Sequence, residues 1–589
     1  MSRALPLSRR LLSLAASSLL LGPLVLTGRA SAAEPGSYTV TPLTFTVDAG
    51  GRTCTVDADL YRPAGVDAAH PAPAVLATNG FGGSKADGST DAIGKAFAAR
   101  GYVGLVYSGL GFGRSGCLIS LDDPRIDGRA ATRLVDFLGG TRAADDGTRA
   151  DFVTKDGAGD PRVGMVGGSY GGAVQLATAS VDPRLDALVP LITWNDLAHS
   201  LAPNGADRAT PGVFKWQWAN GFYLMGEGQP LLVPSLDPSR INGLGCLHFV
   251  TDACDTVRLL NSGRYPDAET RKMLDFARSV SPVSYLDRVK APTLIVQGQA
   301  DSLFTLNEAQ DTYERLQARG VETKMIWQSW GHSGGQAAGE LDLGQGNLET
   351  SYVGQRVLAW FDRHLRGDRS IDTGAEFAYY RSWQSGYGTA ARVPALSQKL
   401  YLSGDGKLVD NRAKVVRGSR AYSNWLVPTS HSESSLAGLI GLPDPRPYDI
   451  KGTYLGWTSA PLSAPVDVVG SPRATLRVVS PKTERVQDSG DAADKLVLFA
   501  KVYDIAPDGT KTLVNRLVAP VRVPDATRPF TVELPGIVHR YEAGHRLEFV
   551  IAASDDAYVG NRGVKPVTVT AAPEDTGVLE LPVVKGRSG

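Results

Sequence analysis

One stretch decides the fold of this chain: Val163-Gly164-Met165-Val166-Gly167-Gly168-Ser169-Tyr170-Gly171-Gly172-Ala173. Its apolar start, 163–166, predicts a buried parallel strand, and 173–178 predicts a helix. Between them lies Gly167-x-Ser169-x-Gly171, the spacing of a nucleophile elbow. The serine of such an elbow adopts strained backbone angles, and a side chain two residues away on either side would collide with neighbouring backbone. We therefore predict a serine raised above a sheet edge, with helix N-terminal amides behind it.

The segments around this stretch predict the rest of a sheet. Short apolar runs at 74–78, 102–107 and 187–192 are typical of buried strands, and helical patterns occupy 90–100 and 129–138. Alternating patterns at 38–47 and 53–61 predict an antiparallel edge. Alternation of strands and helices predicts an α/β doubly wound parallel sheet, whose ligands bind beyond the carboxyl ends of the strands.

Two more side chains are expected at the edge that carries Ser169. A predicted strand at 293–297 leads into the loop of Asp301, and a predicted strand at 324–328 leads to His332. The order serine, acid, histidine is the one this type of elbow requires, whereas Asp287 precedes its strand. We predict Ser169 as nucleophile, His332 as general base and Asp301 as the acid that orients the imidazole.

The oxyanion of an acyl-transfer reaction needs two hydrogen-bond donors. One is expected to be the backbone N–H of Tyr170, directly after the nucleophile. The other is expected to be the N–H of Phe81, in the loop Asn79-Gly80-Phe81-Gly82-Gly83.

The segment 193–280 interrupts the sheet pattern with helical and aromatic sequence. We interpret it as a cap inserted over the active site; the alternative is an insertion whose aromatic residues form a core of their own. Trp194, Asp196, Trp216 and Trp218 are the candidate pocket residues from this segment.

The N-terminus has the pattern of a secretory signal peptide, 1–32. Arg3, Arg9 and Arg10 precede an apolar run at 11–26, which ends at Ala30-Ser31-Ala32. The pattern predicts a secreted protein with no membrane anchor after signal removal, exported by either the Sec or the twin-arginine route.

Four cysteines in an exported chain favour two disulfides. Cys246 and Cys254 would close a short loop inside the cap, which leaves Cys54 with Cys117. The alternative is that some of the thiols are free.

Length and charge set the remaining bounds. The mature chain is too long for one core, so we expect a catalytic domain at 33–192 and 281–370, the cap at 193–280, and a β-sandwich at 375–589. Lys plus Arg and Asp plus Glu each number 61, and a net charge of zero argues against a nucleic-acid partner. Because no His, Cys or acid cluster has ligand spacing, no metal or other cofactor is expected. The oligomeric state is left open.

Several motifs resemble one family. They are the elbow at 167–172, Gly298-Gln299-Ala300-Asp301, Gly331-His332, the helix end at 360–367, Ser459-Ala460-Pro461-Leu462 and the tail at 495–509. Together they resemble the Xaa-Pro dipeptidyl-peptidase family, which includes cocaine esterase and the alpha-amino-acid ester hydrolases. The resemblance covers nearly all of the mature chain and implies an alpha/beta-hydrolase fold with an inserted helical cap. It also implies a C-terminal all-β jelly-roll domain of the galactose-binding type.

One position departs from the family pattern. Members commonly have a tyrosine in the first oxyanion loop, whose hydroxyl donates to the oxyanion, whereas Phe81 has no hydroxyl. Either the backbone N–H suffices or another donor enters from elsewhere.

The resemblance and the ordered trio indicate a serine hydrolase that acts by acyl transfer on a small peptide or ester. The first hypothesis is a dipeptidyl-peptidase that cleaves after Xaa-Pro, which needs acidic groups for the free amine; Asp196, Asp207 and Glu227 are the candidates. The alternative is an acyl (carboxylic) esterase of the cocaine esterase type, with an aromatic-walled pocket. A remote third hypothesis is a non-catalytic surface binding protein.

Overall fold

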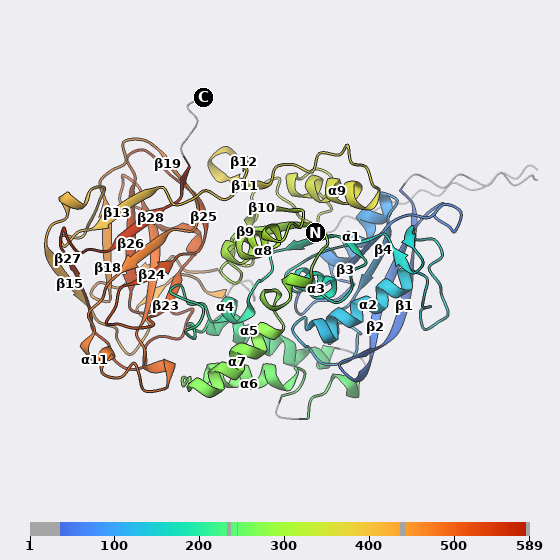
Figure 1. Ribbon diagram of the computed structural model, residues 1–589, viewed down its shortest axis with the longest axis horizontal. Helices are drawn as coiled ribbons and strands as arrows, with labels where there is room; N and C mark the ends of the chain where they lie inside the picture. The colour runs from blue at the N-terminus through green and yellow to red at the C-terminus, as the bar shows by residue number, and fades with distance from the viewer. Residues whose placement is uncertain (1–35, 233–236, 244–245, 436–442, 585–589) are drawn as a thin grey trace, which may run out of the picture.

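The computed structural model describes residues 36–232, 237–243, 246–435 and 443–584. The predicted signal peptide at 1–32 lies outside the described residues. An α/β part and an all-β part lie side by side along the long axis of the molecule (Figure 1). In the described ranges, no helix has both the length and the apolar character needed to cross a membrane.

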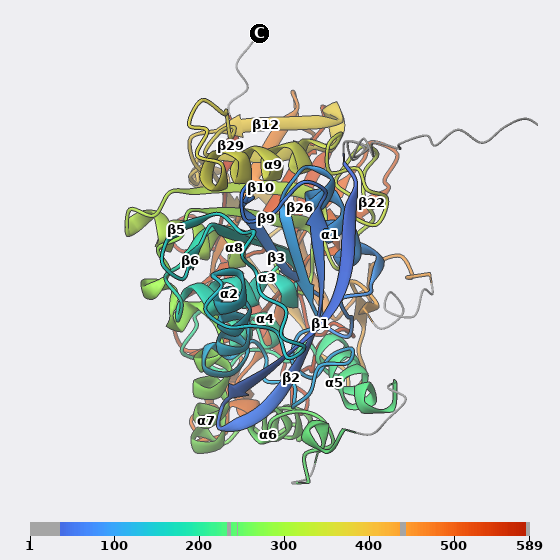
Figure 2. The same ribbon diagram turned by 90° about the vertical axis from the view of Figure 1, so that its right-hand side faces the viewer.

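The α/β part is built on a ten-stranded sheet with the order β1-β2-β4-β3-β7-β8-β9-β10-β11-β12. The run from β4 to β11 is parallel, while the two strands at one edge and the last strand at the other are antiparallel. The bounds are β1 Tyr38–Ala49, β2 Arg52–Pro63, β3 Ala74–Thr78, β4 Val103–Tyr107, β7 Val163–Gly168, β8 Leu185–Leu191, β9 Thr293–Ala300, β10 Thr323–Trp330, β11 Phe377–Arg381 and β12 Gly386–Ala390. The predicted antiparallel edge of 38–47 with 53–61 corresponds to β1 and β2, which lie in front in Figure 2.

Helices cover both faces of this sheet, as a doubly wound fold requires. On one face α1 (Gly88–Ala99) and α9 (Tyr352–Leu365) pack on Val75, Val106 and Val166. On the other face α2 (Arg129–Leu138) and α3 (Tyr170–Ala179) pack on Leu76 and Met165, with α8 (Leu306–Ala318) beside them. The central strands are buried on both sides, which explains their unbroken apolar runs in the sequence.

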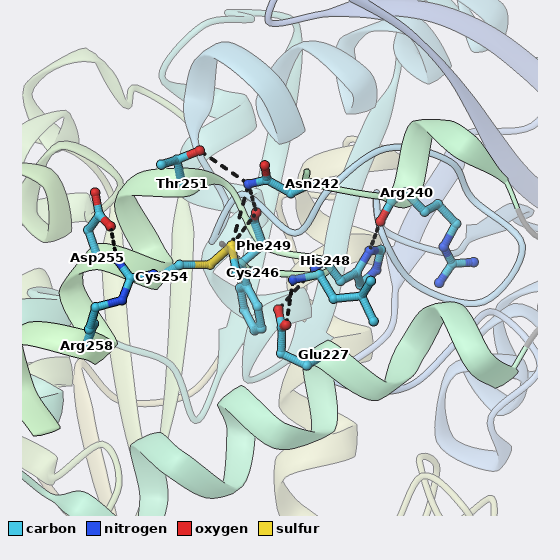
Figure 3. Close-up of a disulfide and its surroundings, with 11 residues drawn as sticks. Glu227, Arg240, Asn242, Cys246, His248, Phe249, Thr251, Cys254, Asp255 and Arg258 are labelled. Atoms are coloured by element: carbon cyan, nitrogen blue, oxygen red, sulfur yellow. Dashed lines mark hydrogen bonds and ion pairs between the residues drawn. A yellow bond between two sulfur atoms is a disulfide. The ribbon is translucent and has the colours of Figure 1, made fainter. Parts of the chain in front are cut away.

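The described residues between β8 and β9 form four α-helices. They are α4 Leu197–Leu201, α5 Trp216–Gly228, α6 Thr251–Asn261 and α7 Asp267–Ser279, seen below the sheet in Figure 1. A disulfide joins Cys246 to Cys254 at the start of α6 (Figure 3). The second disulfide joins Cys54 of β2 to Cys117. Both pairings are those expected from the sequence.

The all-β part consists mainly of one large sheet faced by smaller ones. Its sheet has the order β22-β21-β26-β18-β14-β13-β28-β20-β24, and a second, three-stranded sheet has the order β25-β19-β29. The bounds are β13 Gln398–Leu402, β14 Lys407–Val409, β18 Tyr454–Ser459, β19 Val466–Gly470, β20 Arg473–Leu476, β21 Val497–Ile505, β22 Lys511–Leu513, β24 Phe530–Glu533, β25 Ile537–Tyr541, β26 Arg546–Ala552, β28 Val578–Leu581 and β29 Val583–Val584.

The expected boundary at 375 is wrong by two strands. β11 and β12 follow residue 375, yet β11 pairs in parallel with β10 and β12 pairs with β11, so both extend the first sheet.

Candidate active site

Ser169 lies in the sharp turn between β7 and α3. Its backbone has φ 56° and ψ −119°, a left-handed conformation that costs a non-glycine residue free energy. A Cβ on Gly171 would lie 2.5 Å from the carbonyl oxygen of Thr78, and one on Gly167 would lie 2.8 Å from that of Gly171. The two glycines are therefore required by close backbone packing, which is the steric reason for the G-x-S-x-G spacing.

Three side chains from three loops form one hydrogen-bonded chain. His332 Nε2 lies 2.9 Å from Ser169 Oγ, and His332 Nδ1 lies 2.7 Å from Asp301 Oδ2. A carboxylate can only accept, so Nδ1 carries the proton and Nε2 is left to accept from the serine hydroxyl. This geometry allows the imidazole to take the serine proton while Asp301 stabilises the resulting charge.

The acid of this chain is fully buried and fixed. Asp301 follows β9 with no exposed surface, and its Oδ1 accepts the N–H of Phe304 at 2.8 Å. The rings of Phe304 and Trp218 meet the imidazole of His332 edge to face, with centroids 5.2 and 6.1 Å away. These contacts leave the imidazole little freedom to turn out of line.

The loop after β3 lies directly beside the serine. The Cβ position of Gly80 is 4.0 Å from that of Ser169, and Asn79 fixes the loop by accepting the N–H of Gly109 at 3.0 Å and donating to the carbonyl of Gly80 at 2.8 Å. Phe81 directly follows Gly80, and Tyr170 directly follows Ser169. Both expected oxyanion amides therefore come from segments that adjoin the nucleophile. The Phe81 ring packs against the rings of Phe112, Tyr170, Phe222 and Phe249.

A cavity of about 530 Å³ opens at Ser169 and His332. Ten of its 21 described lining residues have large aromatic or aliphatic side chains: Phe81, Ile93, Leu191, Ile192, Trp218, Phe222, Met225, Trp330, Leu341 and Leu343. Three of these side chains come from α5 at positions i, i+4 and i+7, which place them on one helix face. The one carboxylate among the described lining residues belongs to Asp342. The site can therefore hold a mostly apolar group next to the serine hydroxyl.

A second, smaller cavity of about 90 Å³ lies behind this one, between the cap helices. Phe81 and Phe222 line both cavities. The rest of its described lining is almost entirely apolar and includes Phe249, Met273 and Phe276.

Two of the three tryptophans expected in the pocket lie elsewhere. Trp218 lines the cavity, but Trp194 is buried beneath it against the rings of Tyr170 and Phe304. Trp216 points to the all-β part, where its Nε1 donates to the carbonyl of Asp556 at 2.7 Å.

The three acids considered for binding an amine also have other partners. Asp196, an expected pocket residue, caps α4 and pairs with Arg278 at 3.2 Å. Asp207 accepts backbone amides in its own turn, and Glu227 accepts the N–H groups of residues 247 and 248 (Figure 3). Within the described residues none of them lines the cavity at Ser169. All three thus accept hydrogen bonds from other parts of the protein, and two of them do so from residues 20 or more positions away, which sequence alone does not reveal.

Sequence reasoning missed a polar cluster next to the catalytic chain. Ser302 and Ser333 directly follow Asp301 and His332, and their hydroxyl oxygens are 2.5 Å apart. Glu433 of the all-β part accepts a hydrogen bond from Ser302, and Lys215 donates to the Ser302 carbonyl at 2.6 Å. No local motif marks Glu433, which lies more than a hundred residues away in the chain.

Two family models together match most of the chain. Residues 51–334 match the model described as X-Pro dipeptidyl-peptidase (S15 family). Residues 389–572 match the X-Pro dipeptidyl-peptidase C-terminal non-catalytic domain.

Curated relatives match part of the chain. A candidate serine esterase of Mycobacterium bovis is 23% identical over 305 residues, which is 44% of this chain and 45% of that protein. A candidate Xaa-Pro dipeptidyl-peptidase of Rhodopirellula baltica is 27% identical over 251 residues, or 41% of this chain and 36% of that protein. The matched region spans less than half the length of these relatives.

Solved structures share the whole architecture. An aminopeptidase from a marine-sediment Thaumarchaeota archaeon has a TM-score of 0.65 at 15% identity and covers 95% of this chain and 98% of its own. An alpha-amino acid ester hydrolase has a TM-score of 0.62 at 16% identity, covering 95% and 99%. A CocE/NonD family hydrolase from Staphylococcus aureus has a TM-score of 0.60 at 12% identity, also covering 95% and 99%. The chain has an α/β-hydrolase fold followed by an all-β domain, and it belongs to the X-Pro dipeptidyl-peptidase and cocaine esterase-like family of serine hydrolases.

Proposed function

We propose that the protein is a secreted serine esterase that cleaves esters with apolar acyl groups through Ser169, His332 and Asp301. The observation that carries this proposal is the hydrogen-bonded chain of these three side chains at the floor of a largely apolar cavity. Secretion is supported by the signal-like sequence at 1–32 and by the two disulfides, which persist in oxidising compartments.

The mechanism follows the chemistry of such triads. Ser169 Oγ attacks the acyl carbon while His332 Nε2 takes its proton, and the N–H groups of Tyr170 and Phe81 hold the oxyanion. The ester C–O bond then breaks, and the imidazolium gives its proton to the leaving alcohol. Water, deprotonated by the same imidazole, attacks the acyl-enzyme and releases the acid, so Ser169 regains its proton.

The lining of the cavity favours an ester over a dipeptide. A dipeptidyl-peptidase needs acidic groups to bind the free N-terminal amine, and the three candidates from the cap are engaged elsewhere. Burying an unpaired ammonium against aromatic side chains would carry a large desolvation cost.

One carboxylate keeps the peptidase hypothesis as the second candidate. Asp342 lines the cavity, and its Oδ1 accepts one backbone N–H, from Gln345 at 3.1 Å. Its remaining acceptor capacity would suit a substrate amine.

A substrate panel separates the two functions. We expect p-nitrophenyl esters of apolar acids to be turned over with kcat/KM at least 100-fold above that of Xaa-Pro p-nitroanilides. The reverse ranking would favour the peptidase. In that case Asp342→Asn should raise KM for the anilides and leave KM for the esters unchanged.

A further inference from the structure

A buried carboxylate from the all-β domain contacts the catalytic loops. Glu433 is 4% exposed. Its Oε1 accepts from Ser302 Oγ and, at 3.1 Å, from the indole Nε1 of Trp218. Ser302 Oγ in turn lies 2.5 Å from Ser333 Oγ, and Ser333 Oγ accepts the Ser302 N–H at 3.1 Å. Because Ser302 donates to Glu433, the Ser333 hydroxyl is the donor to Ser302 Oγ.

The partners of Glu433 are neighbours of the proposed catalytic groups. Ser302 follows Asp301, and Ser333 follows His332. Trp218 packs on the imidazole of His332. One carboxylate thus joins the acid loop, the histidine loop and the cap.

A buried cation supports the same loop from its backbone. Lys215 is 3% exposed, and its Nζ donates to the carbonyls of Ser302 at 2.6 Å and Leu303 at 3.0 Å. Burial lowers the pKa of Lys215 to about 8 and raises that of Glu433, and the opposite charges partly offset the cost of burying each group. Burying two charged groups beside one loop is costly, and their hydrogen bonds to that loop offset part of the cost.

The segment that carries Glu433 is itself anchored. The preceding Ser432 donates to Asp555 Oδ1 at 2.8 Å. His431 is held between Asp556 (2.8 Å) and Asp444 (3.1 Å), and hydrogen bonds to these carboxylates raise its pKa. Glu433 therefore follows a segment of the all-β domain, β16 (Ser430–His431), that hydrogen bonds hold in place.

We propose that Glu433 is a positioning residue, through which the all-β domain fixes the loops of Asp301 and His332 in the catalytic geometry. The domain that matches a non-catalytic family model would then contribute directly to turnover. A displacement of about 1 Å in a catalytic group can cost about 100-fold in rate, so loosening both loops should lower kcat strongly.

The test is made on the full-length protein. We expect Glu433→Ala to lower kcat 10- to 100-fold on an activated ester, with KM within about threefold, because the cavity walls other than Trp218 are untouched. Glu433→Gln keeps an amide oxygen that can accept from Ser302 and Trp218, and should restore kcat to within about tenfold of wild type. Hydrogen exchange should rise in the Glu433→Ala protein at 301–304 and 331–334.

A matched control breaks a different contact between the same two parts. Asn307 of α8 donates to Ser471 Oγ at 3.1 Å and accepts the N–H of Gly536 at 2.8 Å. Asn307→Ala should lower Tm and leave kcat of the folded protein unchanged. A purely structural Glu433 would give the same result as Asn307, with kcat within threefold of wild type, and would overturn the proposal.

A second variant covers the case in which Glu433→Ala does not fold. Ser302→Ala removes the same link from the loop side and should lower kcat about tenfold, with KM within about threefold of wild type. No loss of kcat in Ser302→Ala would overturn the proposal. The inference rests on the proposed triad, and Ser169 remains in place in all of these variants. Failure of wild-type Ser169 to react with a fluorophosphonate would refute the triad separately.

Discussion

Replacement of Asp301 by asparagine tests how the proposed triad works. The two residues have the same shape, and the buried site fixes how the amide must lie. The N–H of Phe304 requires an acceptor where Asp301 Oδ1 now lies, so the amide oxygen takes that position and the NH₂ group faces His332. His332 Nδ1 must then accept, which places the ring proton on Nε2. That tautomer donates to Ser169 and cannot take its proton.

The size of the loss follows from the chemistry of the wrong tautomer. Comparable Asp-to-Asn changes in serine proteases lower kcat about 10⁴-fold, which corresponds to about 5.5 kcal/mol of lost transition-state stabilisation. We expect a loss of this order for Asp301→Asn in steady-state hydrolysis of a p-nitrophenyl ester, with a near-native circular dichroism spectrum.

The matched control is Asp287→Asn. Asp287 is an exposed acid that precedes β9 and pairs with Arg315 at 3.1 Å. Its replacement should leave kcat within twofold. Retention of kcat within tenfold of wild type in Asp301→Asn would refute the tautomer argument.

Two further predictions concern the buried acid of α8 and the oxyanion loop. Burial alone would raise the pKa of Glu308, but the hydrogen bond and charge of His199, the charge of Arg208 and the N–H of Asp196 together lower that pKa from its usual 4.5 to about 2. The contribution of Glu308 to stability is therefore present above pH 4.5 and lost as pH falls towards 2. Glu308→Gln should lower the free energy of unfolding by about 3 kcal/mol at pH 7. Denaturation curves of wild type and variant that differ equally at pH 7 and pH 2 would contradict this. Phe81→Tyr should leave kcat within several-fold, because the backbone N–H is unchanged, and should lower Tm, because the added hydroxyl would crowd the four aromatic rings that contact the Phe81 ring. A 100-fold gain in kcat would show that a hydroxyl donor is missing.

The sequence was most informative where chain order determines position in space. Ser169, Asp301 and His332 each follow a strand of a parallel sheet, so their strands bring them to one edge, and the structure places them within hydrogen-bond distance. Their catalytic roles stay predictions. The need for Gly167 and Gly171 was equally predictable, because their spacing reflects close backbone contacts.

Side-chain direction was harder to predict. Trp216 and Trp218 lie two positions apart on α5, about 200° around the helix, so one contacts the all-β domain and the other the imidazole. Choosing between them requires knowing which face of the helix meets the cavity. The role of Glu433 could not be predicted from the sequence, because only the packing of the two domains brings it to its partners Ser302 and Ser333.

The most direct test of the account is covalent labelling of the nucleophile. Wild-type protein treated with a fluorophosphonate should carry one label on the peptide that contains Ser169, as mapped by mass spectrometry. Ser169→Ala should take no label and should lose ester turnover by at least 10⁴-fold, while its Tm stays near that of wild type. A label on a different residue, or turnover in Ser169→Ala within tenfold of wild type, would contradict the proposed serine hydrolase mechanism.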